Sequence, residues 1–291
     1  MNRLLLILVF SVAVPLENFS QEKNVFHDDI LFVQYLIDNH QYEDAIYILK
    51  KRLAVGSYSD TQSDSIYYYL GWSYYSLKSL DSSSASFGKV SRGSAFYLKS
   101  KYFQASDNIF LNRTSEAKQI INNIDNGNDT LLYKLKGFEL AGIALLEHNL
   151  QEFQRQSSEF CYDYFPLAEE EKNMGEYSKI LFKKRKKSPL LAGMMSAVIP
   201  GSGKMYAGYR GQGISAFFLI GMLGGVVAES YIKDGYKSPQ FIAFGSLFTL
   251  FYVGNILGST LSVKIKRNEI HNEVVHNVLF DLHIPLRRIF D

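Results

Sequence analysis

The chain has 291 residues, which is enough for two domains that each bury a core. Hydrophobic residues make up 47% of it, charged residues 21%, and the formal net charge is +2. A dedicated nucleic-acid binder needs a strongly basic face, so this balance excludes nucleic acid as the expected partner.

The N-terminus follows the pattern of a secretory signal peptide. Arg3 supplies a positive charge, and Leu4 to Val14 form an apolar stretch too short to span a bilayer comfortably. We predict a signal peptide over residues 1–20, cleaved before Gln21 or, as the alternative, at Ala13. The domain that follows would then be delivered across the membrane.

Residues 21–182 are predicted to form a domain of helix pairs, visible from residue 28 onward. Apolar residues recur at helical spacing on both sides of a polar break at 39–41, and they do so again between residues 67 and 87. In the first pair these residues are Leu31, Tyr35 and Leu36, then Ala45, Ile48 and Leu49, and in the second pair they are Tyr67, Leu70, Gly71 and Tyr74, then Ser83 and Phe87. Small residues also recur, at positions 45, 83 and 117 and at 71, 105 and 141, so the period is close to 34 residues. A small residue at these positions would let neighbouring helices approach closely.

This pattern resembles the tetratricopeptide repeat, aromatic-x2-Leu-Gly-x2-Tyr followed by small-x3-Phe. The resemblance covers residues 28–160 and departs from the repeat at Val33 and Phe153, where small residues belong. It implies an α-solenoid with a groove that binds a protein or peptide. Helices without a regular repeat are the alternative.

Tyrosines supply the candidate partner-binding residues of this domain, because their rings give rigid contact area with a polar tip. The candidates are Tyr67, Tyr68, Tyr74 and Tyr75. The alternative is that individual rings belong to the core.

The single cysteine, Cys161, excludes an intramolecular disulfide and any cysteine-based zinc or iron–sulfur site. We expect it to be a buried structural residue. No set of residues has the spacing of a catalytic, cofactor-binding or metal-binding site, so no enzymatic activity is predicted.

Residues 183–263 are predicted to form a membrane domain. A basic run, 183–187, precedes spans at 213–231 and 240–262. The segment 189–206 is either a short or re-entrant helix or a third crossing. We favour a third crossing, because it places five basic residues on the cytoplasmic side, as the positive-inside rule requires. These are Lys204, Arg210, Lys264, Lys266 and Arg267.

Small residues on both spans predict helix packing, since membrane helices associate through close backbone approach. They are Gly221 and Gly225 on the first span and Gly254 and Gly258 on the second. A hairpin folded near residue 235 would bring these faces level with the opposite helix. Polar groups in or near the spans are functional candidates by default, and these are Glu229 and Asn255.

A turn-forming motif precedes the spans. Its residues are Ser188-Pro189, Ala192, Pro200-Gly201-Ser202-Gly203 and Tyr206, followed by Tyr209-Arg210-Gly211-Gln212-Gly213 and, in the last span, Gly254-Asn255. They resemble an uncharacterised bacterial membrane module that is similar in style to the two-transmembrane domain family, with Lys204 in place of the usual Gln. The resemblance implies a membrane turn at Pro200, Gly201, Gly203 and Tyr206, attachment to tetratricopeptide domains in Bacteroidetes-like envelope proteins, and no activity.

Residues 264–291 carry an apolar stripe and are predicted to form an amphipathic helix that lies on the membrane surface or on a partner. The stripe consists of Ile270, Val274, Val275, Val278 and Leu282.

Together these features predict an all-α, exported protein of a bacterial inner membrane, with its repeat domain in the periplasm. We expect a scaffold or adaptor in cell-envelope biogenesis that binds protein partners through the repeats, sits in the lipid bilayer and pairs with a membrane subunit. The alternative is a regulatory or structural subunit of a small membrane transporter or channel.

Overall fold

The computed structural model describes residues 17–56, 58–125, 127, 129–183 and 187–290. Over these residues the chain forms thirteen α-helices and no strand, which confirms the predicted all-α class. Most of the predicted signal peptide and the centre of the basic run, 184–186, lie outside the described residues.

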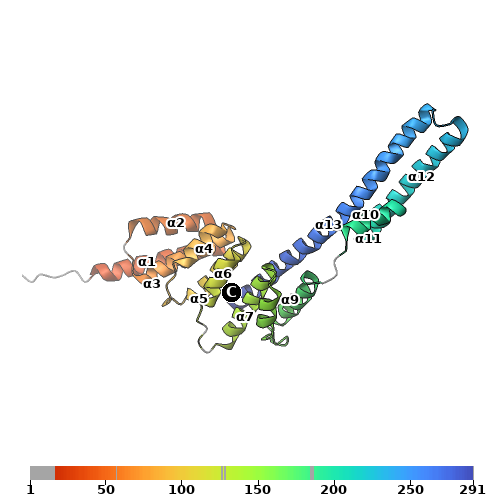
Figure 1. Ribbon diagram of the computed structural model, residues 1–291. Helices are drawn as coiled ribbons and strands as arrows, with labels where there is room; N and C mark the ends of the chain where they lie inside the picture. The colour runs from red at the N-terminus through yellow and green to blue at the C-terminus, as the bar shows by residue number, and fades with distance from the viewer. Residues whose placement is uncertain (1–16, 57, 126, 128, 184–186, 291) are drawn as a thin grey trace, which may run out of the picture. The chain divides into compact units, whose positions relative to one another are not determined.

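The first compact unit consists of the six helices labelled α1 to α6 in Figure 1, together with Phe290. They are α1 (Glu17–Asp38), α2 (Tyr42–Val55), α3 (Asp60–Ser76), α4 (Leu80–Gly88), α5 (Tyr97–Phe110) and α6 (Thr114–Asn122). From α1 to α6 each helix packs against the next, and α1 with α3 and α3 with α5 are also in contact. These are the neighbours that stacked helix pairs would have, although membership of the tetratricopeptide family stays a prediction.

The small repeat positions lie where neighbouring helices meet. A Cβ added to Gly71 would lie 2.5 Å from the Phe87 ring. The Ser83 hydroxyl donates to the Gly71 carbonyl at 3.0 Å, which ties α4 to α3. The other small positions of the pattern are buried as well: Ala45, Ala105, Ala117 and Ala141. The predicted close approach of paired helices is therefore confirmed at Gly71.

The buried face of α1 differs from the predicted one. Val33, Leu36 and Ile37 are buried at the helical spacing i, i+3, i+4. Leu31 and Tyr35, which were expected on this face, are about half exposed. Residues 30–37 are nearly all apolar, so periodicity alone could not select the inward face.

The second compact unit covers residues 130–289. Its helices are α7 (Thr130–Leu146), α8 (Leu150–Ser157), α9 (Ala168–Leu181), α10 (Pro189–Val198), α11 (Ser202–Ala207), α12 (Arg210–Asp234) and α13 (Pro239–Phe290). The division between units falls at residues 129 and 130, whereas the sequence suggested 182 and 183. Helix α7 is buried on every side over 138–145, which is typical of a helix enclosed by its neighbours.

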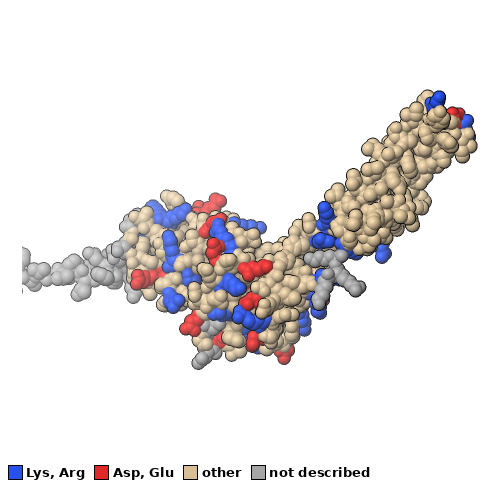
Figure 2. All heavy atoms as spheres, in the orientation of Figure 1, with Lys and Arg blue, Asp and Glu red and all other residues tan. Residues whose placement is uncertain are grey.

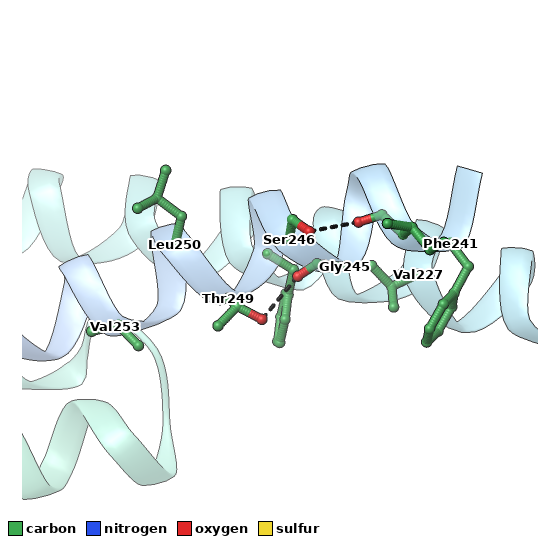
Figure 3. Close-up of a pocket in the computed structure, with 9 residues that line it drawn as sticks. Val227, Phe241, Gly245, Ser246, Thr249, Leu250 and Val253 are labelled. Atoms are coloured by element: carbon green, nitrogen blue, oxygen red, sulfur yellow. Dashed lines mark hydrogen bonds between the residues drawn. The ribbon is translucent and has the colours of Figure 1, made fainter. Parts of the chain in front are cut away.

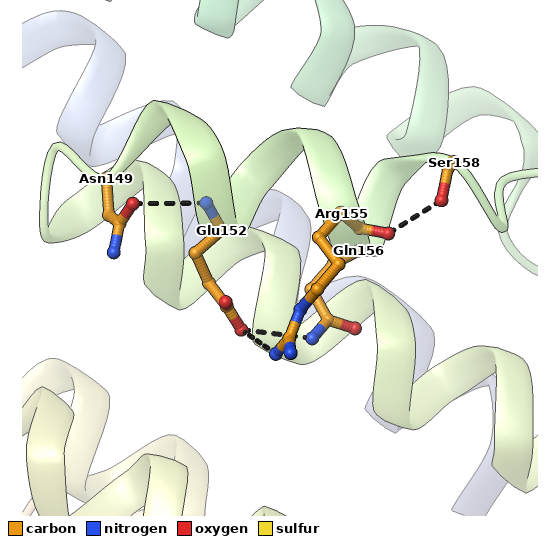
Figure 4. Close-up of polar contacts among 5 residues, drawn as sticks. All are labelled: Asn149, Glu152, Arg155, Gln156 and Ser158. Carbon is orange, nitrogen blue, oxygen red and sulfur yellow. Dashed lines mark hydrogen bonds and ion pairs between the residues drawn. The ribbon is translucent and has the colours of Figure 1, made fainter.

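Local polar contacts set the ends of the short helix α8 (Figure 4). The Asn149 side chain accepts from the backbone N–H of Glu152 at 3.1 Å and so caps the N-terminus. The Glu152 carboxylate then accepts from Arg155 at 2.6 Å and from Gln156 at 3.1 Å. At the other end the Ser158 hydroxyl donates to the Arg155 carbonyl at 2.7 Å.

Helix α13 is continuous over 52 residues, so the predicted C-terminal tail is an extension of the second span. Its apolar stripe packs on the chain itself, where a membrane surface or a partner had been expected. A Cβ added to Gly142 of α7 would lie 2.3 Å from Leu282, so Leu282 fills a notch in α7. The Asp281 carboxylate accepts from the Tyr177 hydroxyl of α9 at 2.9 Å. These contacts join α13 to α7 and α9.

Candidate functional site

Two helices, α12 and the first half of α13, are long and apolar enough to cross a membrane. They form a hairpin that turns at Gly235 (φ 75°), as the sequence predicted. Helix α10 has only ten residues, or about 15 Å at 1.5 Å per residue, against a hydrocarbon core of about 30 Å. A third crossing by one continuous helix is therefore not formed. The alternative describes the segment better, because it folds as two short helices, α10 and α11.

Glycines at the base of the hairpin allow three helices to meet. A Cβ on Gly203 would lie 1.9 Å from the Ala192 carbonyl oxygen, and one on Gly201 would lie 2.0 Å from the carbonyl oxygen of Gly213. Gly201 also has φ 83°, which side-chain-bearing residues rarely adopt. The Pro-Gly-x-Gly motif thus places α11 directly against α10 and α12, which accounts for its glycines by geometry alone.

The other motif residues form hydrogen bonds at the same base. The Ser188 N–H donates to the Tyr206 hydroxyl at 3.2 Å, and the Ser188 hydroxyl caps α10. The N–H of Gly203 donates to the Ser196 hydroxyl at 2.9 Å, and Ser196 pairs with Ser259 of α13 at 2.7 Å. The hydrogen bond between Ser196 and Ser259 thereby links α10 to α13.

Asn255 lies on the buried face of α13 and is 4% exposed. Its main-chain carbonyl accepts from the Ser259 hydroxyl at 2.7 Å. Both polar atoms of its side chain are buried without a hydrogen-bond partner among the described residues. Asn255 is therefore the more deeply buried of the two polar candidates predicted in the spans.

Glu229 is not enclosed by the helices of the hairpin. It is exposed near the tip of the hairpin and forms an ion pair with Lys233, one turn along α12, at 2.6 Å. Surface pairs of this kind contribute little to stability. Glu229 is therefore an exposed, ion-paired residue near the hairpin tip.

Charge is concentrated at the two ends of the hairpin, and its visible flank is largely uncharged (Figure 2). The basic residues at the base are Lys187, Lys204, Arg210, Lys264, Lys266 and Arg267. Two of them contact aromatic rings there: Lys187 Nζ lies 5.6 Å from the ring of Tyr206, and Lys266 Nζ lies 5.8 Å from that of Tyr209. If α12 and α13 both cross a membrane, all six lie on the side where the chain enters and leaves the hairpin.

The glycine faces do not pack the hairpin together in the predicted way. A Cβ on Gly221, Gly225 or Gly254 would meet open space among the described residues, and one on Gly258 would meet only Lys204. Gly224 of α12 does approach α13, because a Cβ there would lie 3.3 Å from the Phe248 ring. The prediction that these glycines pack helices within the hairpin is therefore wrong for the first three.

A shallow groove runs along the hairpin between α12 and α13 (Figure 3). Val227 lines it from α12, and α13 contributes apolar residues together with Gly245, Ser246 and Thr249. The hydroxyls of Ser246 and Thr249 each donate to a carbonyl four residues earlier, at 2.8 Å. Because these hydroxyls are satisfied within α13, the groove presents mainly apolar surface.

The four candidate tyrosines of the repeat domain do not form one surface. Tyr68 is buried and stacks on Phe96, with ring centroids 4.2 Å apart. Tyr67 lies near Lys89, and Tyr74 near Lys50. Tyr75 belongs to a different group, because its ring contacts Trp72 and Phe103. The alternative that individual rings belong to the core therefore applies to Tyr68.

Sequence reasoning missed two surfaces of the first unit. Lys99 of α5 lies with its Nζ 4.4 Å from the ring centroid of Trp72 on α3, so a cation is held over an aromatic surface. On α1, Leu31, Phe32 and Tyr35 are 49%, 50% and 59% exposed. Residues 30–37 contain more apolar side chains than one face of a helix can bury. The sequence could therefore have predicted that some of them form an exposed apolar surface on α1.

Burial also perturbs one acid of the first unit. Asp107 of α5 is fully buried, and burial raises the pKa of its carboxyl to about 7, against which the nearby Ser83 hydroxyl acts in part. Glu139 of α7, in the second unit, is likewise buried, which raises its pKa well above the ordinary value. Neither position was distinguished by the sequence pattern.

Cys161 is exposed, so the expectation of a buried structural cysteine is wrong. It follows α8 in a segment whose backbone N–H groups donate to the Glu171 carboxylate, from Cys161 at 3.1 Å and from Tyr162 at 2.8 Å. The thiol is therefore presented at the surface by a well-defined turn.

Comparison with protein-family models, with curated proteins and with solved structures finds no match for this chain.

Proposed function

We propose that the protein is a membrane-anchored scaffold or adaptor. The hairpin would hold it in a lipid bilayer, and the helical repeats would bind a protein partner. Cell-envelope biogenesis is the setting that the resemblances favour.

The observation that supports this proposal best is the exposed apolar surface on α1. Leu31, Phe32 and Tyr35 lie together on the outside of a helix whose opposite face already supplies core residues. The rings of Phe32 and Tyr35 stack, with centroids 6.3 Å apart. Apolar side chains gathered in this way are characteristic of protein-binding surfaces, where aromatic residues contribute most of the affinity.

The test is purification of the full chain from its native membrane in mild detergent, followed by identification of stoichiometric companions by mass spectrometry. Replacing Leu31, Phe32 and Tyr35 together by Ser should remove a companion that the unaltered protein retains. Tyr133→Ser, which alters an equally exposed aromatic residue on α7, is the matched control and should keep the companion. A companion that survives the triple substitution would refute the assignment of this surface.

The side of the membrane on which the helical domains lie follows from two opposed signals. The predicted N-terminal signal peptide favours export, whereas six basic residues at the hairpin base favour the cytoplasm. We place the domains in the periplasm of a bacterial inner membrane, because an export signal at the N-terminus acts before the hairpin emerges and large domains are translocated largely regardless of their charge.

The exposed thiol of Cys161 offers a direct test of this orientation, since it is the chain's single cysteine. A maleimide that cannot cross the inner membrane should label it in cells with a permeable outer membrane, and Cys161→Ser should abolish the signal. Tyr236→Cys in the Cys161→Ser background moves the thiol to the hairpin tip and should be labelled only after lysis. The opposite pattern would place the helical domains in the cytoplasm.

The alternative of a transporter or channel subunit would have to use Glu229, which is exposed and already paired with Lys233. Asn255 is the remaining polar group that the alternative could use. An adaptor therefore remains our proposal.

A further inference from the structure

The two predicted spans share a sharp charge boundary at the base of the hairpin. Residues 211–228 and 238–263 contain no Asp, Glu, Lys or Arg. Arg210 precedes the first of these stretches and Lys264 follows the second, so a cation flanks each span at the same end. The first stretch is about 27 Å long as a helix, against about 30 Å for the hydrocarbon core of a bilayer. In a bilayer, both cations would lie at the level of the lipid headgroups.

The base carries an excess of positive charge that the tip lacks (Figure 2). Six basic residues lie there, and we call them the basic ring: Lys187, Lys204, Arg210, Lys264, Lys266 and Arg267. In the segments 187–210 and 264–269 the one acidic residue is Glu269, which accepts from Tyr209 at 2.7 Å and from Lys266 at 3.1 Å. At the tip, acids and lysines balance: Glu229, Lys233, Asp234 and Lys237. The hairpin is therefore positive at its base only.

Three members of the basic ring have neither an ion pair nor a hydrogen-bond partner for the side chain among the described residues: Lys204, Arg210 and Lys264. Arg210 and Lys264 are exposed, and Lys204 lies against α13. A Cβ on Gly258 would lie 3.6 Å from Lys204 Cε and 4.0 Å from its Nζ, so this ammonium group lies beside the uncharged stretch of α13. A cation next to hydrocarbon is costly unless its flexible stem lets it reach an anion or water.

The cations of the basic ring do not converge on one point. Lys264 and Lys266 are two positions apart on α13, so they project about 200° apart around the helix. Lys204 comes from α11, and Arg210 is the first residue of α12. A site for one free phosphate needs several donors aimed at a common centre. Charges that surround a helical hairpin at one end instead each face a different neighbour in the bilayer.

Two tyrosines lie among these cations. The ring centroid of Tyr206 is 5.6 Å from Lys187 Nζ, and that of Tyr209 is 5.8 Å from Lys266 Nζ. Tyrosine is enriched where a membrane meets water, because its ring is apolar and its hydroxyl is polar. The tyrosines therefore support the placement of the basic ring at the headgroup level.

We propose that the basic ring binds the headgroups of anionic phospholipids in the bilayer that the hairpin crosses. Lys204, Arg210 and Lys264 confer the preference for negative charge, because no group of the described chain neutralises them. Headgroups line both surfaces of a bilayer, so the ring meets a counter-charge in either orientation. The inference rests on the proposed membrane anchoring and names the class of lipid that the anchor prefers.

For the test, the full chain is reconstituted into vesicles that hold equal amounts of phosphatidylglycerol, which is anionic, and phosphatidylcholine, whose phosphate is balanced by a positive charge. After extraction in mild detergent, native mass spectrometry counts the lipids of each kind that stay bound. The unaltered protein should retain phosphatidylglycerol in excess, by about fivefold for a lipid that faces one basic residue.

Salt separates lipid binding from a site for free phosphate. Potassium chloride should reduce the excess, because it screens exposed charges. Inorganic phosphate at the same ionic strength should reduce it no further. A larger loss with phosphate than with chloride would show a compact phosphate site and overturn the proposal. Because this arm uses the unaltered protein, it does not depend on the folding of any variant.

Matched triple substitutions test the residues themselves. Replacing Lys204, Arg210 and Lys264 together by Gln removes three charges without breaking a described contact of their charged groups, and the two lipids should then be retained almost equally. The control replaces three exposed lysines outside the hairpin by Gln and should keep the excess of phosphatidylglycerol: Lys51, Lys89 and Lys172. Circular dichroism and flotation with the vesicles show whether each variant is folded and inserted.

The proposal is overturned if the unaltered protein retains both lipids equally, or if the folded base variant keeps the excess. It is also overturned if the control variant loses the excess as fully as the base variant does. A protein that floats with the vesicles but shows no preference would leave membrane anchoring intact and refute the basic ring alone. A protein that does not float would refute the anchoring, and with it this inference.

Discussion

Removing the charge of Arg288 should loosen the attachment of α13 to α9. Two nitrogens of Arg288 contact the Glu170 carboxylate, at 3.0 and 3.4 Å, and one also donates to the Pro166 carbonyl at 2.8 Å. The Glu170 side chain is 3% exposed and that of Arg288 34%. Removing one partner of a fully buried pair costs about 3–5 kcal/mol. Because Arg288 is partly solvated, we expect about 2 kcal/mol for Arg288→Met.

Hydrogen exchange measured by mass spectrometry on the full chain in detergent can detect this loss. A decrease of about 2 kcal/mol in the free energy of local opening should accelerate exchange in α9 and in the end of α13 by about thirtyfold. Lys179→Met is the control, because Lys179 pairs with Glu176 on the same helix at a largely exposed site and should have no measurable effect.

A second substitution tests whether the unpaired buried charge of Glu170 is the source of this cost. Adding Glu170→Met to Arg288→Met removes the uncompensated buried charge and should recover most of the lost protection. Unchanged protection in Arg288→Met would show that α13 is not held to α9 by this pair. A double variant that exchanges as fast as Arg288→Met would show that the buried charge is not the source of the cost.

Three further predictions each concern a single residue. Gly203→Ala places a Cβ 1.9 Å from a main-chain oxygen of α10 and should destabilise the membrane domain by at least about 2 kcal/mol in a thermal melt in detergent, whereas Gly211→Ala, which faces open space among the described residues, should not. Burial raises the pKa of Asp107 from 3.8 to about 7, so the folded state holds a proton that the unfolded state has released, and stability should fall as the pH rises through this range. Asp107→Asn should reduce that dependence in urea titrations followed by tryptophan fluorescence, and a slope unchanged from that of the unaltered protein would contradict the assignment. Glu229→Gln should leave stability and companion binding unchanged, since the pair it breaks is exposed, and any loss of function would revive the transport alternative.

The repeat pattern predicted contacts well where a small residue and a large one must meet. Gly71 and Phe87 are in contact because only a residue without a side chain leaves room for the ring, and this requirement is visible as a spacing in the sequence. The inward face of α1 was harder to predict. Because almost every residue from 30 to 37 is apolar, the apolar pattern does not distinguish the buried face from the exposed one. In the structure Leu31, Phe32 and Tyr35 are the exposed residues.

In the predicted membrane domain, the length of helix α10 was more informative about the segment 189–206 than the distribution of basic residues. The positive-inside rule favoured a third crossing, but Pro200 and Gly201 end α10 after ten residues, too few to reach across a bilayer. The prediction that the glycine pairs pack within the hairpin was wrong for a different reason. A spacing of four residues places Gly221 and Gly225 on one face of α12, but it does not say which neighbour that face meets.

The end of α13 shows why an amphipathic stripe predicts a helix but not what the helix contacts. The periodic apolar residues of this helix could be recognised in the sequence. The surface that receives them is a notch at Gly142, which lies 140 positions before Leu282 and belongs to no periodic pattern. The structure adds that no loop separates the second span from this contact. A rotation of the span about its axis must therefore also turn the face that carries Leu282 and Asp281, and the filled notch and the hydrogen bond to Tyr177 resist that rotation. The helical part of the second unit is thus joined to the hairpin by shape and by side-chain contacts as well as by the chain itself.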